Sequence, residues 1–421
     1  MRLRRVLLGA VLALLLASPC AAAQAPSGAP RLQGAEAAIL IEASTGDVLL
    51  ARESRQRRQI ASTTKLMTAL VALQQTDLDD VFSVPAYDAL PVESQIGLRP
   101  GERMSVRDLL RATLLASAND AAAAIAVGTM GSVDAFVAEM NRRAAALGLR
   151  DTSFANPIGL DDEGNFSSAH DLARLAIALR RFEFFRRTVD LPSATLRSGA
   201  RTRTVINRNR LVRRVDVVDG VKTGHTGRAG YVLVGSATRD GVTVVSVVLG
   251  EPSERARDAD SLALLRYGLR SYEARTVMAQ GRVLGRVALR YRDGEHVDVV
   301  AGATVERVLP TGARTSVSVG GVPSEVDGPL PRGTRLGTAT VRRGEDVLAR
   351  VPVVTARPVA EAGLGDRLDD MLARSQTVIA LVLLLACSLP LLLLRRRAIN
   401  RRRALDAEHR RARRREESAV P

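Results

Sequence analysis

Lysine is almost absent from this basic sequence. The 421 residues include 61 lysines and arginines, but only Lys65 and Lys222 are lysines. Arginine stands at every other basic position. A lysine amine can lose its proton inside a protein, whereas an arginine guanidinium stays protonated. The two lysines are therefore the first candidates for a chemical role that arginine cannot fill.

Cysteine, histidine and aromatic residues are also scarce. The two cysteines, Cys20 and Cys387, lie in apolar segments near the two ends, so the region between them has no thiol and no disulfide. The four histidines lack the spacing of a metal site, and the sequence predicts none. The net charge of +16 gathers mainly at the two ends and has no accompanying aromatic pattern, which argues against nucleic acid as a partner.

Both ends of the chain have the features of membrane-directed segments. A basic start, an apolar run and the small residues before Ala23 predict a signal peptide over 1–23. Residues 377–394 carry no charge and would span about 27 Å as a helix, which predicts one transmembrane helix. A buried core helix is the alternative, but core helices are seldom apolar on all sides. The arginine-rich segment 395–421 follows, and the positive-inside rule places it in the cytoplasm.

The segment between these ends predicts an α/β (α+β) chain with two domains. Residues 35–273, after a linker over 24–34, mix helical periodicity with apolar β-branched runs, typical of an antiparallel sheet with a helical subdomain. Residues 274–358 contain short valine-rich runs between turn residues, which predicts a small all-β domain. Residues 359–376 would link that domain to the membrane. Three runs predict neighbouring antiparallel strands: Val217–Val221, Tyr231–Ala237 and Val242–Leu249.

A serine and a lysine stand three residues apart where a helical pattern begins. Ser62 and Lys65 open a segment whose apolar residues repeat with helical spacing up to Gln74. Residues three apart on a helix share one face, with Cβ atoms about 5–6 Å apart. A serine hydroxyl becomes a good nucleophile when a neighbouring base takes its proton. Lysine is such a base when burial or a nearby positive charge lowers its pKa. A helix start capped by serine is the competing interpretation.

Two other short motifs carry suitable polar groups. Ser117 and Asn119 lie between two predicted helices, where a hydroxyl relays a proton and an amide holds a substrate amide, although a helix-linking loop looks the same. Lys222 begins a Lys-Thr-Gly-His run on a predicted strand, and its cation suits a substrate carboxylate. Gly224 in that run permits close approach of a ligand backbone. An edge-strand lysine that opposes aggregation is the alternative.

Together the three motifs resemble those of the serine, penicillin-recognising DD-peptidases, in which Ser-x-x-Lys, Ser-x-Asn and Lys-Thr-Gly follow in this order. The resemblance covers about residues 35–272 and narrows to the low-molecular-mass penicillin-binding proteins that act as D-alanyl-D-alanine carboxypeptidases. It implies a β-lactamase/transpeptidase-like fold, with 275–357 matching the family's β-rich C-terminal domain by position and composition. The stretches that carry it are Ser62–Ala69, Ser117–Ala121, Asn156–Leu160, Ser168–Ala173 and Lys222–Tyr231.

The resemblance implies roles in the reaction for five residues. Ser62 would be the acylated nucleophile, and Lys65 its general base. Ser117 would pass a proton to the leaving amine, and Asn119 would hold the amide on the acyl side of the substrate. Lys222 would stay charged, lower the pKa of Lys65 and attract the terminal carboxylate.

The resemblance also implies how the carboxylate and the oxyanion are bound. Thr223 would donate a hydrogen bond to the carboxylate. Arg257 resembles a family arginine that binds the same group, with Arg255 left open as the alternative. The backbone N–H of His225 would pair with that of Ser62 as an oxyanion hole.

The predicted function is therefore removal of the terminal D-alanine from peptidoglycan pentapeptide stems, without metal or organic cofactor and with β-lactams as covalent inhibitors. The predicted location is the bacterial cytoplasmic membrane, with the catalytic domain on its outer side. DD-endopeptidase and transpeptidase activities use the same acyl-enzyme and stay open. A class A β-lactamase is disfavoured because the sequence has no Glu-x-x-Leu-Asn run. A catalytically silent wall-binding or β-lactam-sensing protein is disfavoured because all the chemical groups are present.

Overall fold

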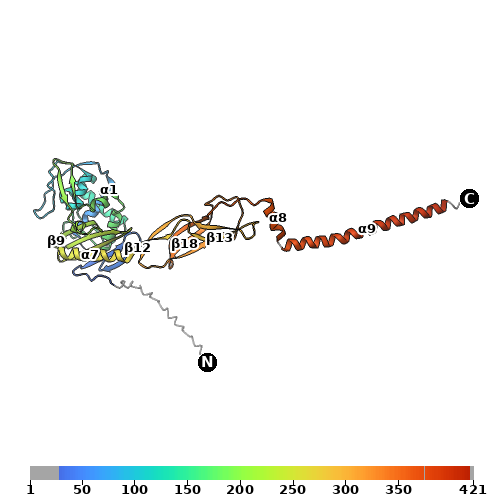
Figure 1. The fold of residues 1–421 in the computed structure, drawn as a ribbon. Helices are drawn as coiled ribbons and strands as arrows, with labels where there is room; N and C mark the ends of the chain where they lie inside the picture. The colour runs from blue at the N-terminus through green and yellow to red at the C-terminus, as the bar shows by residue number, and fades with distance from the viewer. Residues whose placement is uncertain (1–27, 374, 418–421) are drawn as a thin grey trace, which may run out of the picture. The chain divides into compact units, whose positions relative to one another are not determined.

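The computed structural model describes residues 28–373 and 375–417, so the predicted signal peptide lies outside the described residues. The chain divides into two compact units, which Figure 1 shows in order along the chain. The first comprises the chain up to Ala274 together with Val308–Thr311. The second comprises Arg275–Arg307 and everything from Gly312 onward.

A five-stranded antiparallel sheet forms the centre of the first unit, with strand order β2-β1-β11-β10-β9. The three predicted neighbouring strands are confirmed as β9, β10 and β11, and their runs of valine are buried on both faces of the sheet. Helix α7 packs against β10 and β11, and α5 packs against β1 and β11. Strand β9 is left at one edge. The bounds are β1 Ala37–Glu42, β2 Val48–Arg52, β9 Val218–Thr226, β10 Gly230–Arg239, β11 Val242–Glu251, α5 Ala169–Leu179 and α7 Glu254–Ser271.

The apolar pattern of Ser261–Arg270 predicts a helix, and α7 contains it but begins seven residues earlier, at Glu254. The Oγ atom of Ser253 accepts a hydrogen bond from the backbone N–H of Ala256 at 3.1 Å and caps the helix there. The first turns of α7 are rich in charged residues, so a search for periodic apolar residues does not detect them. Helices α5 and α6 (Glu183–Val189) had not been predicted.

The sequence predicts helices that start at Ser105 and Ser132, and the structure confirms both starts. Ser105 caps α2 by accepting from the backbone N–H of Asp108 at 3.3 Å, and Ser132 caps α4 in the same way. The helix predicted from Ser105 to about Ala116 ends differently, because its last five residues, Ala112–Ala116, form a π-helical turn. Such turns often occur at functional sites. The helices are α1 Lys65–Gln75, α2 Val106–Arg111, α3 Asn119–Met130 and α4 Val133–Ala146, with a 3₁₀ turn Ala61–Thr64 before α1 and another at Arg210–Arg213.

Short strands complete the first unit and position its loops. Three two-stranded sheets pair β3 with β6, β4 with β5 and β7 with β8. The β4–β5 pair holds the two ends of the segment 84–102, which contributes to the site described below. The bounds are β3 Arg58–Gln59, β4 Val81–Ser83, β5 Arg103–Ser105, β6 Phe166–Ser167, β7 Ser193–Leu196 and β8 Arg203–Ile206.

The second unit contains a six-stranded sheet with the order β16-β18-β19-β14-β13-β17. The valine-rich runs predicted as strands are confirmed as β13, β14, β16, β18 and β19. Buried residues such as Val351 and Val353 alternate with more exposed ones. Strands β12, β15 and β17 had not been predicted, and the predicted linker contains helix α8. The bounds are β12 Tyr272–Met278, β13 Val283–Leu289, β14 His296–Ala301, β15 Val305–Pro310, β16 Ser316–Gly320, β17 Glu325–Val326, β18 Arg335–Arg343, β19 Asp346–Thr355 and α8 Leu364–Ala373.

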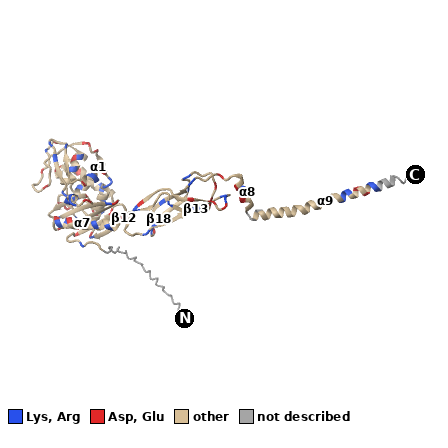
Figure 2. Cartoon of the chain, viewed as in Figure 1, with Lys and Arg blue, Asp and Glu red and all other residues tan. Residues whose placement is uncertain are grey.

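Helix α9, Ser375–Glu417, contains the predicted membrane segment 377–394. Within the described residues its part Val378–Arg411 is the one unbroken helix long and apolar enough to cross a membrane. The large apolar side chains of this helix are exposed, as a lipid-facing surface requires. Figure 2 shows its basic residues towards the C-terminal end.

Candidate active site

The nucleophile candidate lies in the tight turn just before α1. Ser62 belongs to the 3₁₀ turn Ala61–Thr64, and Lys65 is the first residue of α1. Lys65 is fully buried, and its Nζ atom lies 3.1 Å from Oγ of Ser62. The structure therefore brings the serine and the lysine together as the three-residue spacing predicts.

Two oxygen atoms occupy the other directions around the Lys65 amine. Nζ donates to Oδ1 of Asn119 at 2.5 Å and to the backbone carbonyl of Ile158. A neutral amine has two N–H bonds and one lone pair. Because both carbonyl oxygens can only accept, a neutral Lys65 spends its two N–H bonds on them. Its lone pair then faces the hydroxyl of Ser62.

The environment of Lys65 favours this neutral form. Burial lowers the pKa of Lys65 to about 7. Among the neighbouring charges, Glu93 and Asp120 act to raise the pKa, and Arg208 acts to lower it. Burial is thus the main cause, where the sequence had pointed to the charge of Lys222 as well.

Lys222 joins a second hydroxyl to the same site. Its Nζ atom donates to Oγ of Ser117 at 2.9 Å and to the carbonyl of Thr223 at 2.8 Å. Ser117 takes up a left-handed backbone conformation, with φ 61°, between the π-helical turn and α3. Burial, followed by repulsion from Lys65, lowers the pKa of Lys222 well below its ordinary value. Burial and the charge of Lys65 thus act against the positive charge that the family resemblance implies for Lys222.

The edge strand β9 contains the Lys-Thr-Gly-His run and passes close to Ser62. A Cβ atom on Gly224 would lie 3.0 Å from the backbone nitrogen of Ser62, so glycine is needed for this close approach. Thr223 is buried, and His225 is exposed. The ring of His225 stacks on Tyr231 with centroids 4.0 Å apart. This contact gives the side chain of His225 a structural role that the sequence did not suggest.

The structure does not bring Arg257 into the cavity that holds Ser62. Its side chain is buried on α7 and forms ion pairs with Glu254 at 3.1 Å and with Asp258 at 2.7 Å. The positive charge of Arg257 still lowers the pKa of Lys222. Arg255, the alternative left open by the sequence, is exposed on the same helix.

Three of the predicted site residues line a cavity of about 520 Å³. Ser62, Asn119 and His225 line it, whereas Lys65, Ser117 and Lys222 lie buried behind its wall. The other lining residues come from the segment 84–102, from residues 158–161 and from residues 226–227 at and just after the end of β9. They are Leu90, Val92, Glu93, Ser94, Ile158, Gly159, Leu160, Asp161, Thr226 and Gly227.

The sequence interpretation missed two groups that contact the core of this site. Glu93 accepts a hydrogen bond from Nδ2 of Asn119 at 2.7 Å, and the carbonyl of Ile158 accepts from Lys65. Ile158 falls within the stretch Asn156–Leu160, which the resemblance had marked without giving it a role. Glu93 had no motif around it that pointed to the site.

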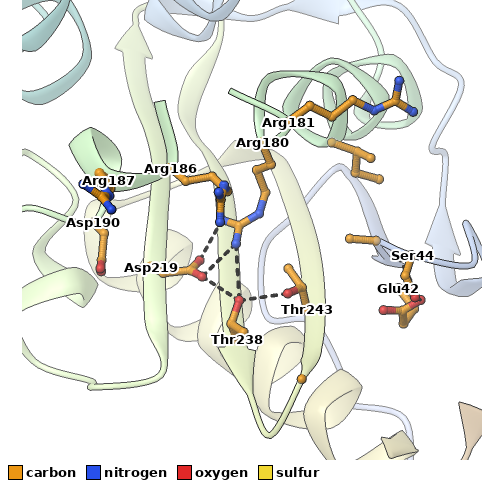
Figure 3. A pocket seen from close by; sticks show the side chains of 13 residues that line it. Glu42, Ser44, Arg180, Arg181, Arg186, Arg187, Asp190, Asp219, Thr238 and Thr243 are labelled. Carbon is orange, nitrogen blue, oxygen red and sulfur yellow. Dashed lines mark hydrogen bonds and ion pairs between the residues drawn. The ribbon is translucent and has the colours of Figure 1, made fainter. Parts of the chain in front are cut away.

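A larger cavity, of about 790 Å³, lies elsewhere in the first unit and holds none of the predicted site residues. Figure 3 shows Arg180, Asp219, Thr238 and Thr243 facing one another in this cavity. Arg180 donates to both carboxylate oxygens of Asp219, at 3.0 and 2.9 Å, and Thr238 donates to the same carboxylate at 2.6 Å. The size of a cavity alone therefore does not locate the candidate active site.

A serine hydroxyl facing a buried lysine, with a second lysine bound to a second serine hydroxyl beside a strand edge, defines the class of serine acyl-transfer enzymes that use lysine in place of histidine. Residues 22–253 match the peptidase S11 family, described as D-alanyl-D-alanine carboxypeptidase, and residues 272–361 match the penicillin-binding protein 5 C-terminal domain. The chain belongs to the peptidase S11 family and is a serine-type D-alanyl-D-alanine carboxypeptidase.

Relatives and solved structures agree with this assignment. The D-alanyl-D-alanine carboxypeptidase DacF of Bacillus subtilis is 32% identical over 340 residues, which cover 78% of this chain and 87% of DacF. The structure of penicillin-binding protein 5 from Haemophilus influenzae is similar with TM-score 0.59 and 29% identity, covering 79% of this chain and 99% of that one. The Streptomyces K15 DD-transpeptidase has TM-score 0.55 and 33% identity, covering 57% of this chain and 98% of that one.

Proposed function

We propose that the protein removes the terminal D-alanine from peptidoglycan pentapeptide stems through an acyl-enzyme on Ser62. The observation that carries this proposal is the 3.1 Å contact between Oγ of Ser62 and Nζ of a lysine whose pKa is lowered to about 7. A base with a pKa near the working pH is the most effective proton acceptor. β-Lactams would acylate the same oxygen.

Acylation begins when Ser62 passes its proton to Lys65 and its Oγ attacks the carbonyl carbon of the penultimate D-alanine. The negative charge on the carbonyl oxygen is received by the backbone N–H groups of Ser62 and His225. Ser117 then gives its proton to the nitrogen of the leaving D-alanine as the C–N bond breaks. The buried contact between Ser117 and Lys222 supports this relay, because Lys222 can replace that proton. Water then attacks the ester carbonyl and gives a proton to the Ser117–Lys222 pair, while Lys65 returns its proton to the departing Oγ of Ser62, which releases the shortened peptide.

The terminal carboxylate would bind beside β9, close to Lys222 and Thr223, which are buried and do not line the cavity. Nearby anions raise the pKa of a lysine. A bound carboxylate would therefore act against the lowering of the Lys222 pKa by burial and would favour the charged form of Lys222. Asn119 would hold the acyl-side amide through its Nδ2 atom. Arg257 would contribute positive potential at a distance, because Glu254 and Asp258 already hold its guanidinium.

The direct test incubates the purified full chain in detergent with a pentapeptide that ends in D-Ala-D-Ala and measures free D-alanine. We expect the wild type to release D-alanine. Release should stop after treatment with penicillin and should be absent in Ser62→Ala. An enzyme that binds penicillin covalently but releases no D-alanine would contradict the proposed peptidase activity.

Similarity to the K15 DD-transpeptidase favours acyl transfer as a second activity. Adding an amine acceptor to the same assay would reveal it as a new peptide product.

Acylation should depend on pH through Lys65. The lysine accepts a proton only when neutral, and its pKa is lowered to about 7. We therefore expect the rate of acylation by a fluorescent penicillin to be nearly constant above pH 8. Below pH 7 it should fall about tenfold per unit as Lys65 becomes protonated. A rate that stays constant down to pH 5 would contradict the assignment of Lys65 as the base.

We further propose that the mature protein is held in the bacterial cytoplasmic membrane by α9 after removal of residues 1–23. The exposed apolar part of α9 and the arginines further along the same helix support an outer catalytic domain and a cytoplasmic tail. The full chain should stay in the membrane pellet after an alkaline wash, and a chain ending at residue 373 should not. Release of both would contradict the anchor.

A further inference from the structure

Glu93 occupies a position next to the catalytic lysine that no motif explains. It lies on the segment 84–102 and lines the cavity that holds Ser62. One of its carboxylate oxygens, Oε2, accepts hydrogen bonds from Nδ2 of Asn119 at 2.7 Å and from the hydroxyl of Tyr87. The other, Oε1, accepts from the backbone N–H of Leu90 at 3.0 Å. Three donors thus fix one carboxylate.

The segment that carries Glu93 is itself fastened to the start of α3. The backbone N–H of Asn119 donates to the carbonyl of Ser94 at 2.7 Å. The carboxylate of Asp120 accepts from the backbone N–H groups of Ile96 at 3.2 Å and of Leu98 at 3.0 Å. The carboxylate of Glu93 is therefore placed before any substrate arrives.

An ionised carboxylate only accepts hydrogen bonds. Burial acts to raise the pKa of Glu93, but hydrogen bonds from Asn119 and Tyr87 outweigh burial and leave the pKa below its ordinary value. Glu93 is thus ionised at neutral pH and can face only the NH₂ end of the Asn119 amide. The carbonyl end of that amide must then point to Lys65, where Oδ1 accepts from Nζ.

We propose that Glu93 is a positioning residue for acylation: it fixes the orientation of the Asn119 amide and, through it, the direction of the Lys65 lone pair towards Ser62. If the Asn119 amide were reversed, its NH₂ group would meet the Lys65 amine. The lone pair of Lys65 would then turn towards Asn119 and away from Oγ of Ser62. This inference rests on the proposed function, because it assumes that Lys65 is the base.

Glu93 also acts on the charge of Lys65. The charged groups around Lys65 are Glu93 and Asp120, which raise its pKa, Arg208, which lowers it, and the neighbouring Lys222. Removal of the Glu93 charge should therefore lower the pKa of Lys65 further. Loss of the amide orientation should lower the plateau of the pH profile, whereas loss of the charge should move its acid limb, so the two effects are separable.

The experiment measures acylation of the full chain in detergent by a fluorescent penicillin from pH 5 to pH 10. In Glu93→Gln we expect the acid limb to move to lower pH and the plateau to fall about tenfold to a hundredfold, because an amide no longer fixes Asn119. In Glu93→Asp the charge stays but the reach is lost. We expect a reduced plateau with the acid limb close to that of the wild type.

Glu163→Gln is the matched control, because Glu163 is an exposed carboxylate that is not among the residues lining the cavity. We expect it to leave both the limb and the plateau unchanged. A Glu93→Gln profile equal to that of the wild type would overturn the proposal. So would equal plateau losses in both Glu93 variants without any movement of the limb, since a merely structural role predicts that result. Failure of the wild type itself to label would instead contradict the proposed function.

Discussion

Replacement of Lys65 by arginine should slow acylation by penicillin about 10²- to 10⁴-fold, which is the usual contribution of a general base. Arginine keeps the positive charge but cannot become neutral. It therefore has no lone pair to accept the proton of Ser62 at 3.1 Å. The measurement is the second-order rate constant for labelling by a fluorescent penicillin, repeated at pH 10. Loss of the rate at both pH values distinguishes the absence of a base from a base with a raised pKa.

Lys222→Arg is the matched comparison for this experiment. Lys222 is also fully buried and also contacts a serine, Ser117, at 2.9 Å. Arginine there keeps a cation and several N–H donors, so we expect more residual acylation than in Lys65→Arg. Thermal unfolding of both variants shows whether either larger side chain disrupts the fold. The reverse order of activities in two folded variants would show that the roles of the two lysines are exchanged.

The parts of the site that periodicity predicted are local, whereas the family resemblance implied that Ser117, Asn119 and Lys222 join them. Ser62 and Lys65 meet because a helical turn places residues three apart on one face. The valine runs of β9, β10 and β11 fix a sheet whose edge strand carries Lys222. These features follow from periodicity within a few residues, so they can be read without knowledge of the fold.

The groups that the sequence did not predict reach the site through tertiary contacts. The carbonyl of Ile158 lies 93 residues from Lys65 along the chain, and every residue carries a carbonyl, so no residue type marks it. Glu93 is one carboxylate among 45 acidic residues and becomes distinctive only when α3 places Asn119 against it. The expectation for Arg257 came from its position after the last strand. That position could not show that Glu254 and Asp258 hold its guanidinium.

Replacement of Gly159 by alanine should reduce acylation severely without removing any chemical group. Gly159 has φ +86°, and a Cβ atom there would lie against the backbone of the nucleophile turn, 2.6 Å from the carbonyl carbon of Ala61 and 2.9 Å from the nitrogen of Ser62. Backbone atoms cannot rotate away as a flexible side chain can. The turn must therefore move, and a displacement of about 1 Å at a reacting group can cost about a hundredfold in rate. The left-handed backbone and the overpacking together should lower the free energy of unfolding by about 2–4 kcal/mol.

Gly131→Ala separates the clash at Gly159 from the backbone strain. Gly131 has φ +79° at the end of α3, and a Cβ atom there meets no other atom within 4 Å. It should lose about 1–2 kcal/mol of stability from the left-handed backbone alone and keep its acylation rate. The measurements are denaturant unfolding and labelling by a fluorescent penicillin for both variants. If Gly159→Ala is folded and labels as fast as Gly131→Ala, the Asn156–Leu160 stretch does not hold the nucleophile turn in place, and the position of Ser62 must be set by α1 and β9 alone.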